Sequence, residues 1–209
     1  MTDIFVHDIN FGSYANGPGR RTVLHVSGCS IRCAGCFSPF TWKVSDERKV
    51  RTVEGVAKLL MSVPAYGLSI SGGEPSEQLT ALYELLSYPG LQEHFSHGGV
   101  LIYSGREKQD LYAQPTWNEM VRANLVDVLV VGPYIQGLRI SKITGLRSSA
   151  NQEVVFITDL FNKHDFSILP TVEIRVTNDT VTLHGFPRRE DVALIEAISG
   201  GAERQEHPA

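Results

Sequence analysis

Three cysteines lie between positions 29 and 36, and the 209-residue chain contains no others. They are Cys29, Cys33 and Cys36, so their spacing is C-x3-C-x2-C. Iron–sulfur clusters are held by closely spaced thiolates, and a cluster that only carries electrons normally has four cysteine ligands. Three thiolates can hold three irons of a [4Fe–4S] cube and leave the fourth iron open, as catalytic metal sites keep one position open for a substrate. The spacing therefore predicts chemistry at iron.

Other interpretations of the three cysteines stay open from the residues alone. A structural zinc site would need a fourth ligand, and His25 is near enough in sequence to supply it. A disulfide with one spare thiol is a second alternative, and burial as small apolar side chains is a third. The residues among the cysteines favour a loop over a strand or a helix face; these are Ser30, Arg32, Ala34 and Gly35.

The composition is that of one globular domain, or of one domain with an appendage, with 42% hydrophobic and 20% charged residues. The formal net charge of −4 gives no bulk basic field that would recruit nucleic acid. No apolar run approaches the roughly 20 residues of a membrane span, and the first residues lack the pattern of a signal peptide. Cysteines that must remain thiolates suit a reducing compartment. We therefore expect a cytoplasmic protein without nucleic-acid or membrane partners.

Short apolar segments alternate with helical patterns over the first 131 residues. The expected strands cover residues 21–27, 67–71, 99–103 and 126–131. The expected helices cover residues 53–61, with Val56, Leu59 and Leu60 on one side, residues 76–86, and a segment that runs from a capping box at Thr116 to about residue 123. Such alternation indicates parallel βα units with both faces of the sheet covered. The fold class expected is α/β, with an open partial β/α barrel, because the units are too few for a closed one.

In sheets of parallel strands the ligand binds at the carboxyl ends of the strands. Each expected strand is followed there by a distinctive turn. The turns are the cysteine loop, Gly72-Gly73-Glu74-Pro75, Ser104-Gly105 and Gly132-Pro133. We expect all four to meet at one rim, with Asp127 away from it in a structural role.

The last third of the chain has a different pattern. Alternation over 171–176 and 180–184, around a turn signal at Asn178-Asp179, predicts a β-hairpin. Residues 188–199 have the spacing of an amphipathic helix. We divide the chain into a core, 1–155, and a C-terminal extension, 156–209, packed on that core.

The cysteine spacing, followed by the aromatic Phe37, resembles the signature of the radical S-adenosylmethionine (SAM) enzymes. Residues 16–20, 27–29 and 36–42 are similar to the activating enzymes of glycyl-radical enzymes. Residues 127–135, with 147–152, resemble the activators of anaerobic ribonucleotide reductase in particular, and the whole resemblance covers about residues 1–155.

The resemblance implies a [4Fe–4S] cluster and S-adenosyl-L-methionine as cofactors. One electron from the reduced cluster would cleave SAM to a 5′-deoxyadenosyl radical, which would install a glycyl radical on a partner such as anaerobic ribonucleotide reductase. Flavodoxin or ferredoxin would be the reductant. Two other functions stay open: a radical SAM enzyme that modifies a peptide or a small molecule, and a non-enzymatic iron–sulfur electron carrier or redox sensor. The missing fourth cysteine and the Gly-Gly-Glu-Pro turn speak against the carrier or sensor.

The resemblance also implies roles for individual residues. Cys29, Cys33 and Cys36 would ligate the cluster. The expected cofactor contacts are Phe37, against the adenine, with Ser71, Gly72, Gly73, Glu74, Ser104 and Gly105. The candidate substrate or partner face comprises Arg106, Arg147, Asn151 and Gln152.

Three positions depart from the ribonucleotide reductase activators. Val131 stands where those enzymes usually carry Asp, Arg106 where they carry an aromatic residue, and Ser38 where they carry Asn. We interpret Val131 as the loss of a carboxylate from the rim and Arg106 as an added cation, which leaves the identity of the partner open.

Overall fold

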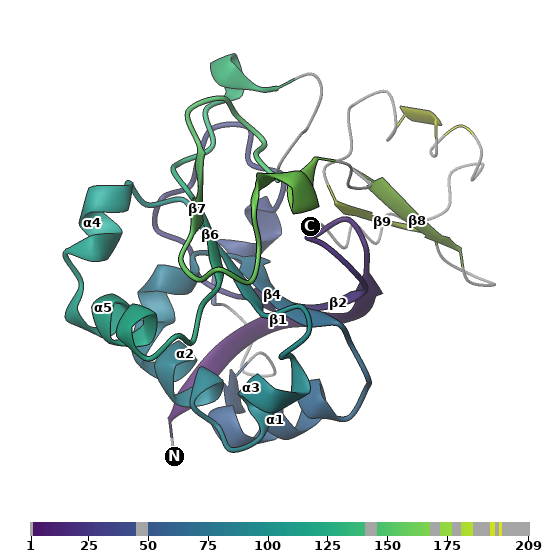
Figure 1. Ribbon diagram of the computed structural model, residues 1–209. Helices are drawn as coiled ribbons and strands as arrows, with labels where there is room; N and C mark the ends of the chain where they lie inside the picture. The colour runs from purple at the N-terminus through teal and green to yellow at the C-terminus, as the bar shows by residue number, and fades with distance from the viewer. Residues whose placement is uncertain are drawn as a thin grey trace.

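A computed structural model describes residues 2–44, 50–140, 146–167, 172–176 and 181–185, together with residues 193, 194 and 197. This part of the chain has an α/β fold. Its centre is an open sheet of seven strands, with parallel and antiparallel pairs, in the order β3-β1-β2-β4-β5-β6-β7 (Figure 1). The strands are β1 (Asp3–Ser13), β2 (Arg21–Val26), β3 (Val50–Thr52), β4 (Gly67–Gly72), β5 (Val100–Ser104), β6 (Val128–Val131) and β7 (Glu153–Phe156). The α-helices are α1 (Val53–Met61), α2 (Leu79–Leu86), α3 (Leu91–His94), α4 (Lys108–Tyr112) and α5 (Pro115–Arg122). No helix among these described residues is long and apolar enough to cross a membrane.

The four central strands, β2, β4, β5 and β6, are parallel, as the alternating pattern predicts. Helix α1 connects β2 to β4, α2 and α3 connect β4 to β5, and α4 and α5 connect β5 to β6. The strands β1, β3 and β7, of which β3 and β7 are the edges of the sheet, are antiparallel to their neighbours and were not predicted. The parallel arrangement brings the carboxyl ends of four strands to the same edge of the sheet.

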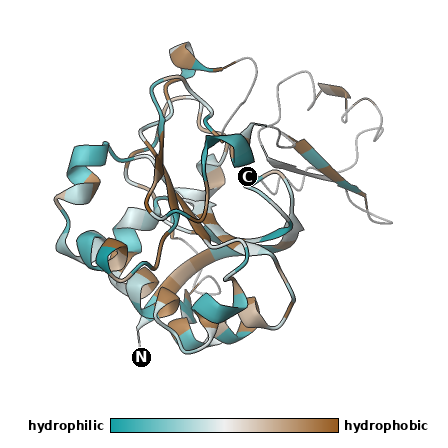
Figure 2. Ribbon diagram, in the orientation of Figure 1, coloured by the Kyte–Doolittle hydropathy of each residue, from teal (hydrophilic) through white to brown (hydrophobic). Residues whose placement is uncertain are grey.

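The larger core lies between the sheet and the helices, whose apolar faces turn towards the strands (Figure 2). Its centre is made of aliphatic side chains, including Leu24, Ile70, Leu82, Leu85 and Leu129. A smaller cluster, on other side chains of β5 and β6, contains Leu101, Val128, Val130, Leu146, Phe161 and Phe166. Both faces of β5 and β6 are therefore covered, and this explains why their sequences read as nearly continuous apolar runs.

Helix α1 has the predicted bounds, and Thr52 caps it by accepting a hydrogen bond from the Gly55 amide. Leu59 is 48% exposed, so its predicted place on the buried side was wrong. The helix expected over 76–86 is divided: the 3-10 helix η3 (Pro75–Gln78) precedes α2. The predicted capping box at Thr116 was also wrong, because α5 begins at Pro115, a residue well suited to the first turn of a helix.

Arg21 closes the end of the parallel strands opposite to their carboxyl ends. Its guanidinium is fully buried, and burial lowers its pKa to about 10, against smaller raising effects of Tyr103, Asp127 and Tyr66. It donates to five oxygens, which belong to Pro18 (3.2 Å), Leu68 (2.6 Å), Ser69 (2.7 Å), Gly98 (2.7 Å) and Gly99 (2.9 Å). Asp127 lies at the same end and accepts from the Val100 amide at 2.8 Å, which confirms its predicted structural role.

The predicted hairpin is present as the strands β8 (Val172–Val176) and β9 (Val181–Gly185), which pair antiparallel. Its expected turn at Asn178-Asp179 lies outside the described residues, as does most of the expected helix over 188–199. The division at residue 155 stays a prediction.

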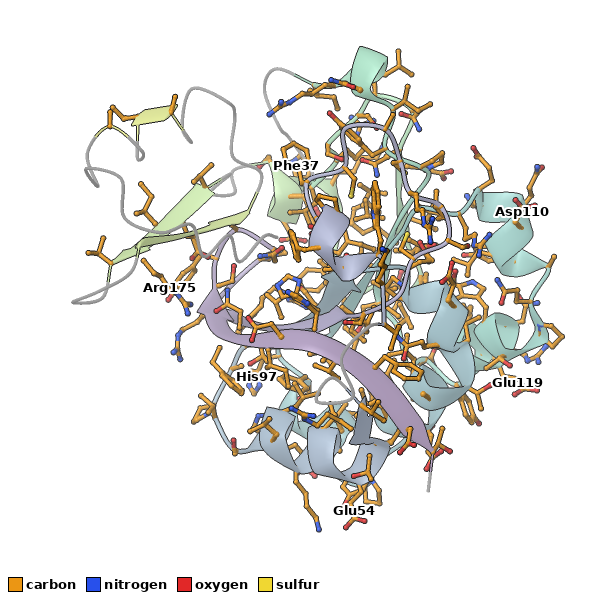
Figure 3. All side chains as sticks on the ribbon, turned by 180° about the vertical axis from the view of Figure 1, so that it is seen from behind. Phe37, Glu54, His97, Asp110, Glu119 and Arg175 are labelled. Atoms are coloured by element: carbon orange, nitrogen blue, oxygen red, sulfur yellow. The ribbon has the colours of Figure 1, made fainter. Side chains whose placement is uncertain are left out.

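The hairpin is held to the end of β1 by two side chains of β8. Glu173 accepts from the Ser13 hydroxyl at 2.7 Å and from the Tyr14 amide at 2.6 Å. Arg175 donates to the carbonyls of Phe11 and Gly12 at 3.0 and 3.1 Å, and Figure 3 shows its side chain reaching towards the end of β1. Two residues apart on one strand, Glu173 and Arg175 point to the same side, so this face of β8 is the one that contacts the core.

Candidate active site

A cavity lies at the carboxyl ends of β2, β4, β5 and β6, and all four predicted turns contribute to its wall. Most of the predicted site residues line it, namely Cys29, Cys33, Cys36, Phe37, Ser71, Gly72, Gly73, Glu74, Ser104, Gly105 and Gln152. Arg106, Arg147 and Asn151 are not part of its lining. The topology of the sheet thus brings residues more than 100 positions apart to one place.

The cysteine loop leaves β2 and is fixed at both ends. The Gly28 amide donates to the Thr41 carbonyl at 2.8 Å, and the Cys29 amide donates to the Trp42 carbonyl at 3.1 Å. Between these points Arg32 has a φ of 48°, a left-handed conformation that non-glycine residues seldom adopt. The two ends of the loop are therefore hydrogen-bonded to each other, the chain between them turns tightly, and the three cysteines line the cavity.

Backbone N–H groups lie against two of the sulfurs within the loop itself. The Ser38 amide donates to Cys36 Sγ at 3.3 Å. Burial raises the pKa of the Cys29 thiol, the amides of Arg32 and Ile31 lower it, and the carboxylates of Glu74 and Glu77 raise it again. An amide that points at sulfur stabilises a thiolate, and such hydrogen bonds help to set the potential of a bound cluster.

The third sulfur receives its hydrogen bond from another turn. Burial raises the pKa of the Cys33 thiol, and the amide of Tyr134, which follows β6, is the largest opposing cause. All three sulfurs therefore have amide donors, and all three thiols are free and only partly buried. These donors fit the thiolate ligands of an iron–sulfur cluster.

The alternative interpretations of the cysteines fit less well. No disulfide joins the three residues, and their partial exposure differs from that of packed apolar side chains. A zinc ion would draw its ligands to within about 2.3 Å of one point, but in the described part of the chain no three His, Cys, Asp or Glu side chains are grouped to hold one ion. A cube takes its thiolates on separate irons, so they can stand further apart.

Two glycines of the turn after β4 pack against the start of the cysteine loop. Gly72 has a φ of 101°, and a Cβ atom on Gly73 would lie 2.2 Å from the Gly28 carbonyl oxygen. The Gly73 amide donates to the Val26 carbonyl at 2.8 Å. Only glycine allows this backbone approach, so the turn and the loop form one continuous wall.

Glu74 joins the turns after β4 and β5. Its side chain is 1% exposed, and it accepts from the Ser76 amide at 2.9 Å, the Ser104 hydroxyl at 2.8 Å and the Gly105 amide at 2.7 Å. The sequence indicated a carboxylate near a bound SAM. In the structure both carboxylate oxygens are already engaged within the protein, so Glu74 holds the cavity wall together.

Phe37 is packed among other side chains on the far part of the cysteine loop (Figure 3). The Tyr134 ring lies 5.5 Å from it, centre to centre, and the guanidinium carbon of Arg139 lies 5.0 Å from the centre of the Phe37 ring. These contacts fix the orientation of an aromatic ring that lines the cavity, and its role towards adenine stays a prediction.

The predicted substrate face is mostly a brace for the Gly132-Pro133 turn. Gln152 donates to the Gly132 carbonyl at 3.0 Å and accepts from the Ser148 hydroxyl at 2.9 Å. Asn151 donates to the Pro133 carbonyl at 2.7 Å, and Arg147 donates to the Gln152 carbonyl at 3.2 Å. Only Gln152 and Ser148 of this group also line the cavity.

Val131 faces the main core and is 2% exposed, whereas its neighbour Val130 lines the cavity. Adjacent residues of a strand point to opposite faces. The interpretation of Val131 as a carboxylate lost from the rim was therefore wrong, because this position faces the helices.

Sequence reasoning missed several lining residues: Ile31, Trp42, Tyr103, Val130, Tyr134 and Gly185. Tyr103 precedes the Ser104-Gly105 turn and Tyr134 follows the Gly132-Pro133 turn, so their places beside predicted turns could have indicated that they line the cavity. Burial raises the pKa of the Tyr103 hydroxyl well above its ordinary value, which keeps it protonated. Gly185 belongs to the hairpin, and nothing in its local sequence indicated a place at the cavity.

The described geometry can be compared with known proteins. Residues 15–155 match the family model of the 4Fe-4S single cluster domain. The chain belongs to this family. It is 29% identical to the anaerobic ribonucleoside-triphosphate reductase-activating protein of Enterobacteria phage T4 over 156 residues, which cover 73% of this chain and 94% of that protein.

Further relatives have related names. The anaerobic ribonucleoside-triphosphate reductase-activating protein of Salmonella typhi is 29% identical over 144 residues, or 66% of this chain and 90% of that protein. The pyruvate formate-lyase-activating enzyme of Staphylococcus aureus strain USA300 is 32% identical over 88 residues, or 39% of this chain and 35% of that enzyme. The chain is a radical SAM oxidoreductase of the activase type, and its cofactors are a [4Fe–4S] cluster and SAM.

Proposed function

We propose that this enzyme installs a glycyl radical on a partner protein, and that the partner is an anaerobic ribonucleotide reductase. The observation that carries the proposal is the cavity, in which three free thiols with amide donors face the glycine turn after β4. The choice of partner is supported by the two relatives with the matching name, which align over 94% and 90% of their own lengths. When bound, the cluster and SAM supply a 5′-deoxyadenosyl radical that can take a hydrogen atom from a glycine Cα.

The chain's own residues position and enclose this chemistry. Cys29, Cys33 and Cys36 would hold the cluster, while the Gly72-Gly73 turn, packed against the backbone of Val26 and Gly28, forms the neighbouring wall of the cavity. The open sheet supports a partial barrel of the radical SAM type, with a side through which a protein loop can enter. Gly185 of the hairpin lines the same cavity, so we infer that the C-terminal extension borders the entry of this loop. The three free cysteines suit a reducing cytoplasm.

The proposal is tested by anaerobic cluster reconstitution, reduction with dithionite, and assay of 5′-deoxyadenosine from SAM. The Cys33→Ala variant should lose cleavage, whereas Ser62→Ala, at the exposed end of α1, should keep it. Adding anaerobic ribonucleotide reductase from the same organism should then produce the electron paramagnetic resonance signal of a glycyl radical.

Two other outcomes would contradict parts of the proposal. Cleavage of SAM without a glycyl radical on the reductase would favour a peptide or a small molecule as substrate. Arg106, one of the departures from the ribonucleotide reductase activators, does not line the cavity and so gives this alternative no direct support. A cluster that forms but neither binds nor cleaves SAM, even with the reductase present, would favour an electron carrier or a redox sensor.

A further inference from the structure

Three side chains form a network on the outer side of the cysteine loop. Ser30 follows the first cysteine, and its amide donates to Glu77 Oε1 at 2.8 Å, while its hydroxyl donates to the same oxygen. Arg106 Nη2 lies 3.2 Å from Glu77 Oε1 and 3.4 Å from the Ser30 hydroxyl oxygen. We propose that Ser30, Glu77 and Arg106 are a clamp that positions the cysteine loop and balances the charge beside the cluster.

The clamp joins three of the four segments that build the cavity wall. Ser30 belongs to the cysteine loop, Glu77 to η3, and Arg106 follows the Ser104-Gly105 turn. The Arg106 amide also donates to the Ser104 hydroxyl oxygen at 3.2 Å, and that hydroxyl donates to Glu74. The clamp is thus continuous with the buried Glu74 network, although none of its members lines the cavity.

The geometry supports a clamp that positions the cysteine loop, rather than one whose ion pair adds much to stability. The side chains of Arg106 and Glu77 are 36% and 26% exposed, and partly exposed ion pairs contribute little to stability. The bond from the Ser30 amide is different, because a carboxylate accepts it and it fixes the backbone next to Cys29. Arg106 in turn holds Glu77 in place, which gives this cation a local role beside the cysteine loop.

The clamp also bears on the potential of the cluster. A reduced cluster carries one more negative charge than an oxidised one, and nearby net charge is one of the factors that set its potential. Glu77 and Arg106 together add no net charge beside Cys29. Neutralising one of them leaves the other uncompensated, so the two changes should move the potential in opposite directions. This inference concerns the cluster site alone and does not depend on the proposed partner.

The test is a redox titration of the reconstituted protein, followed by electron paramagnetic resonance. Glu77→Gln should raise the cluster potential and Arg106→Gln should lower it, while Arg106→Lys, which keeps the charge, should stay near the native value. Glu54→Gln and Arg122→Gln, exposed residues of α1 and α5, are the matched controls and should leave it unchanged. Shifts of the same sign in Glu77→Gln and Arg106→Gln, or no shift in either, would overturn the electrostatic part.

Hydrogen exchange of the cluster-free protein tests the positioning part, and it does so even if a variant fails to take up iron. Loss of the Ser30 amide bond in Glu77→Ala should speed exchange in the cysteine loop by about tenfold or more, as expected for a bond to a charged acceptor. Helix α1 should exchange as in the native protein. Unchanged exchange of the loop would show that Glu77 does not hold it.

Discussion

Replacing Glu74 by glutamine separates a residue that holds the cavity wall from one that only contacts a ligand. Both carboxylate oxygens accept hydrogen bonds, from Ser76, Ser104 and Gly105, at 2.7 to 2.9 Å. A glutamine keeps one oxygen, and its amide group must face one or more of these donors. Each hydrogen bond to a charged group is worth about 1.5–3 kcal/mol, and a buried donor left without a partner costs about 1–3 kcal/mol. We expect Glu74→Gln to lower the free energy of unfolding by about 3–5 kcal/mol, since one or two bonds are lost.

The measurement is anaerobic urea unfolding of the protein without cluster and SAM, so that no ligand contributes. Ser104→Ala should lower stability by about 1–3 kcal/mol, and the double variant should lose less than the two single changes together because they share one bond. Glu119→Gln, on an exposed part of α5 (Figure 3), is the control for the change in charge. Native stability of the ligand-free Glu74→Gln protein would refute the reasoning, and weaker SAM binding alone would then assign Glu74 to the ligand.

Three further predictions concern the rest of the chain. Arg21→Lys should lower the free energy of unfolding by about 2–5 kcal/mol in urea denaturation, because the three donors of a lysine cannot serve five acceptors, four of them in buried bonds. Arg20→Lys, at the exposed neighbouring position, should change the free energy of unfolding by less than about 0.5 kcal/mol. Arg175→Ala should release the hairpin from β1 and speed its cleavage by a protease, whereas Val176→Thr, 72% exposed on the other face of β8, should not. Gln152→Ala should free the Gly132 turn and weaken SAM binding in calorimetry by about tenfold, from the loss of at least one bond; unchanged binding would mean that the turn does not shape the cofactor site.

The parallel part of the fold could be predicted because each unit carries its own local signals. The strands β2, β4, β5 and β6 are largely buried, apolar residues fill β5 and β6, and a glycine turn marks the end of each strand. Helix α1 had clear periodicity and a cap at Thr52. The same signals placed the four turns at one edge of the sheet, and the cavity is there.

The antiparallel strands β1 and β3 lacked such signals. The long strand β1 has register shifts between Val6 and Asp8 and between Phe11 and Ser13, which break the alternation of buried and exposed residues. β3 is only three residues long, and its two last residues are exposed. Whether these segments form strands depends on pairing with other strands, and the local sequence does not indicate which strands those are.

The roles of polar residues at the site were harder to predict than their location. Glu74 and Arg106 belong to the predicted rim, yet one is buried with its oxygens engaged inside the protein and the other contacts Glu77 and Ser30 outside the cavity. A sequence gives the type of side chain at the end of a strand, whereas the hydrogen-bond partner depends on how neighbouring turns meet. The polar groups that touch a cofactor are therefore fewer than the polar groups that surround it, and in this chain much of the surrounding set holds the cysteine loop and the strand turns in register. Variants of these residues should change cluster potential, loop exchange or unfolding before they change the chemistry, so measurements on the cofactor-free protein distinguish the two groups.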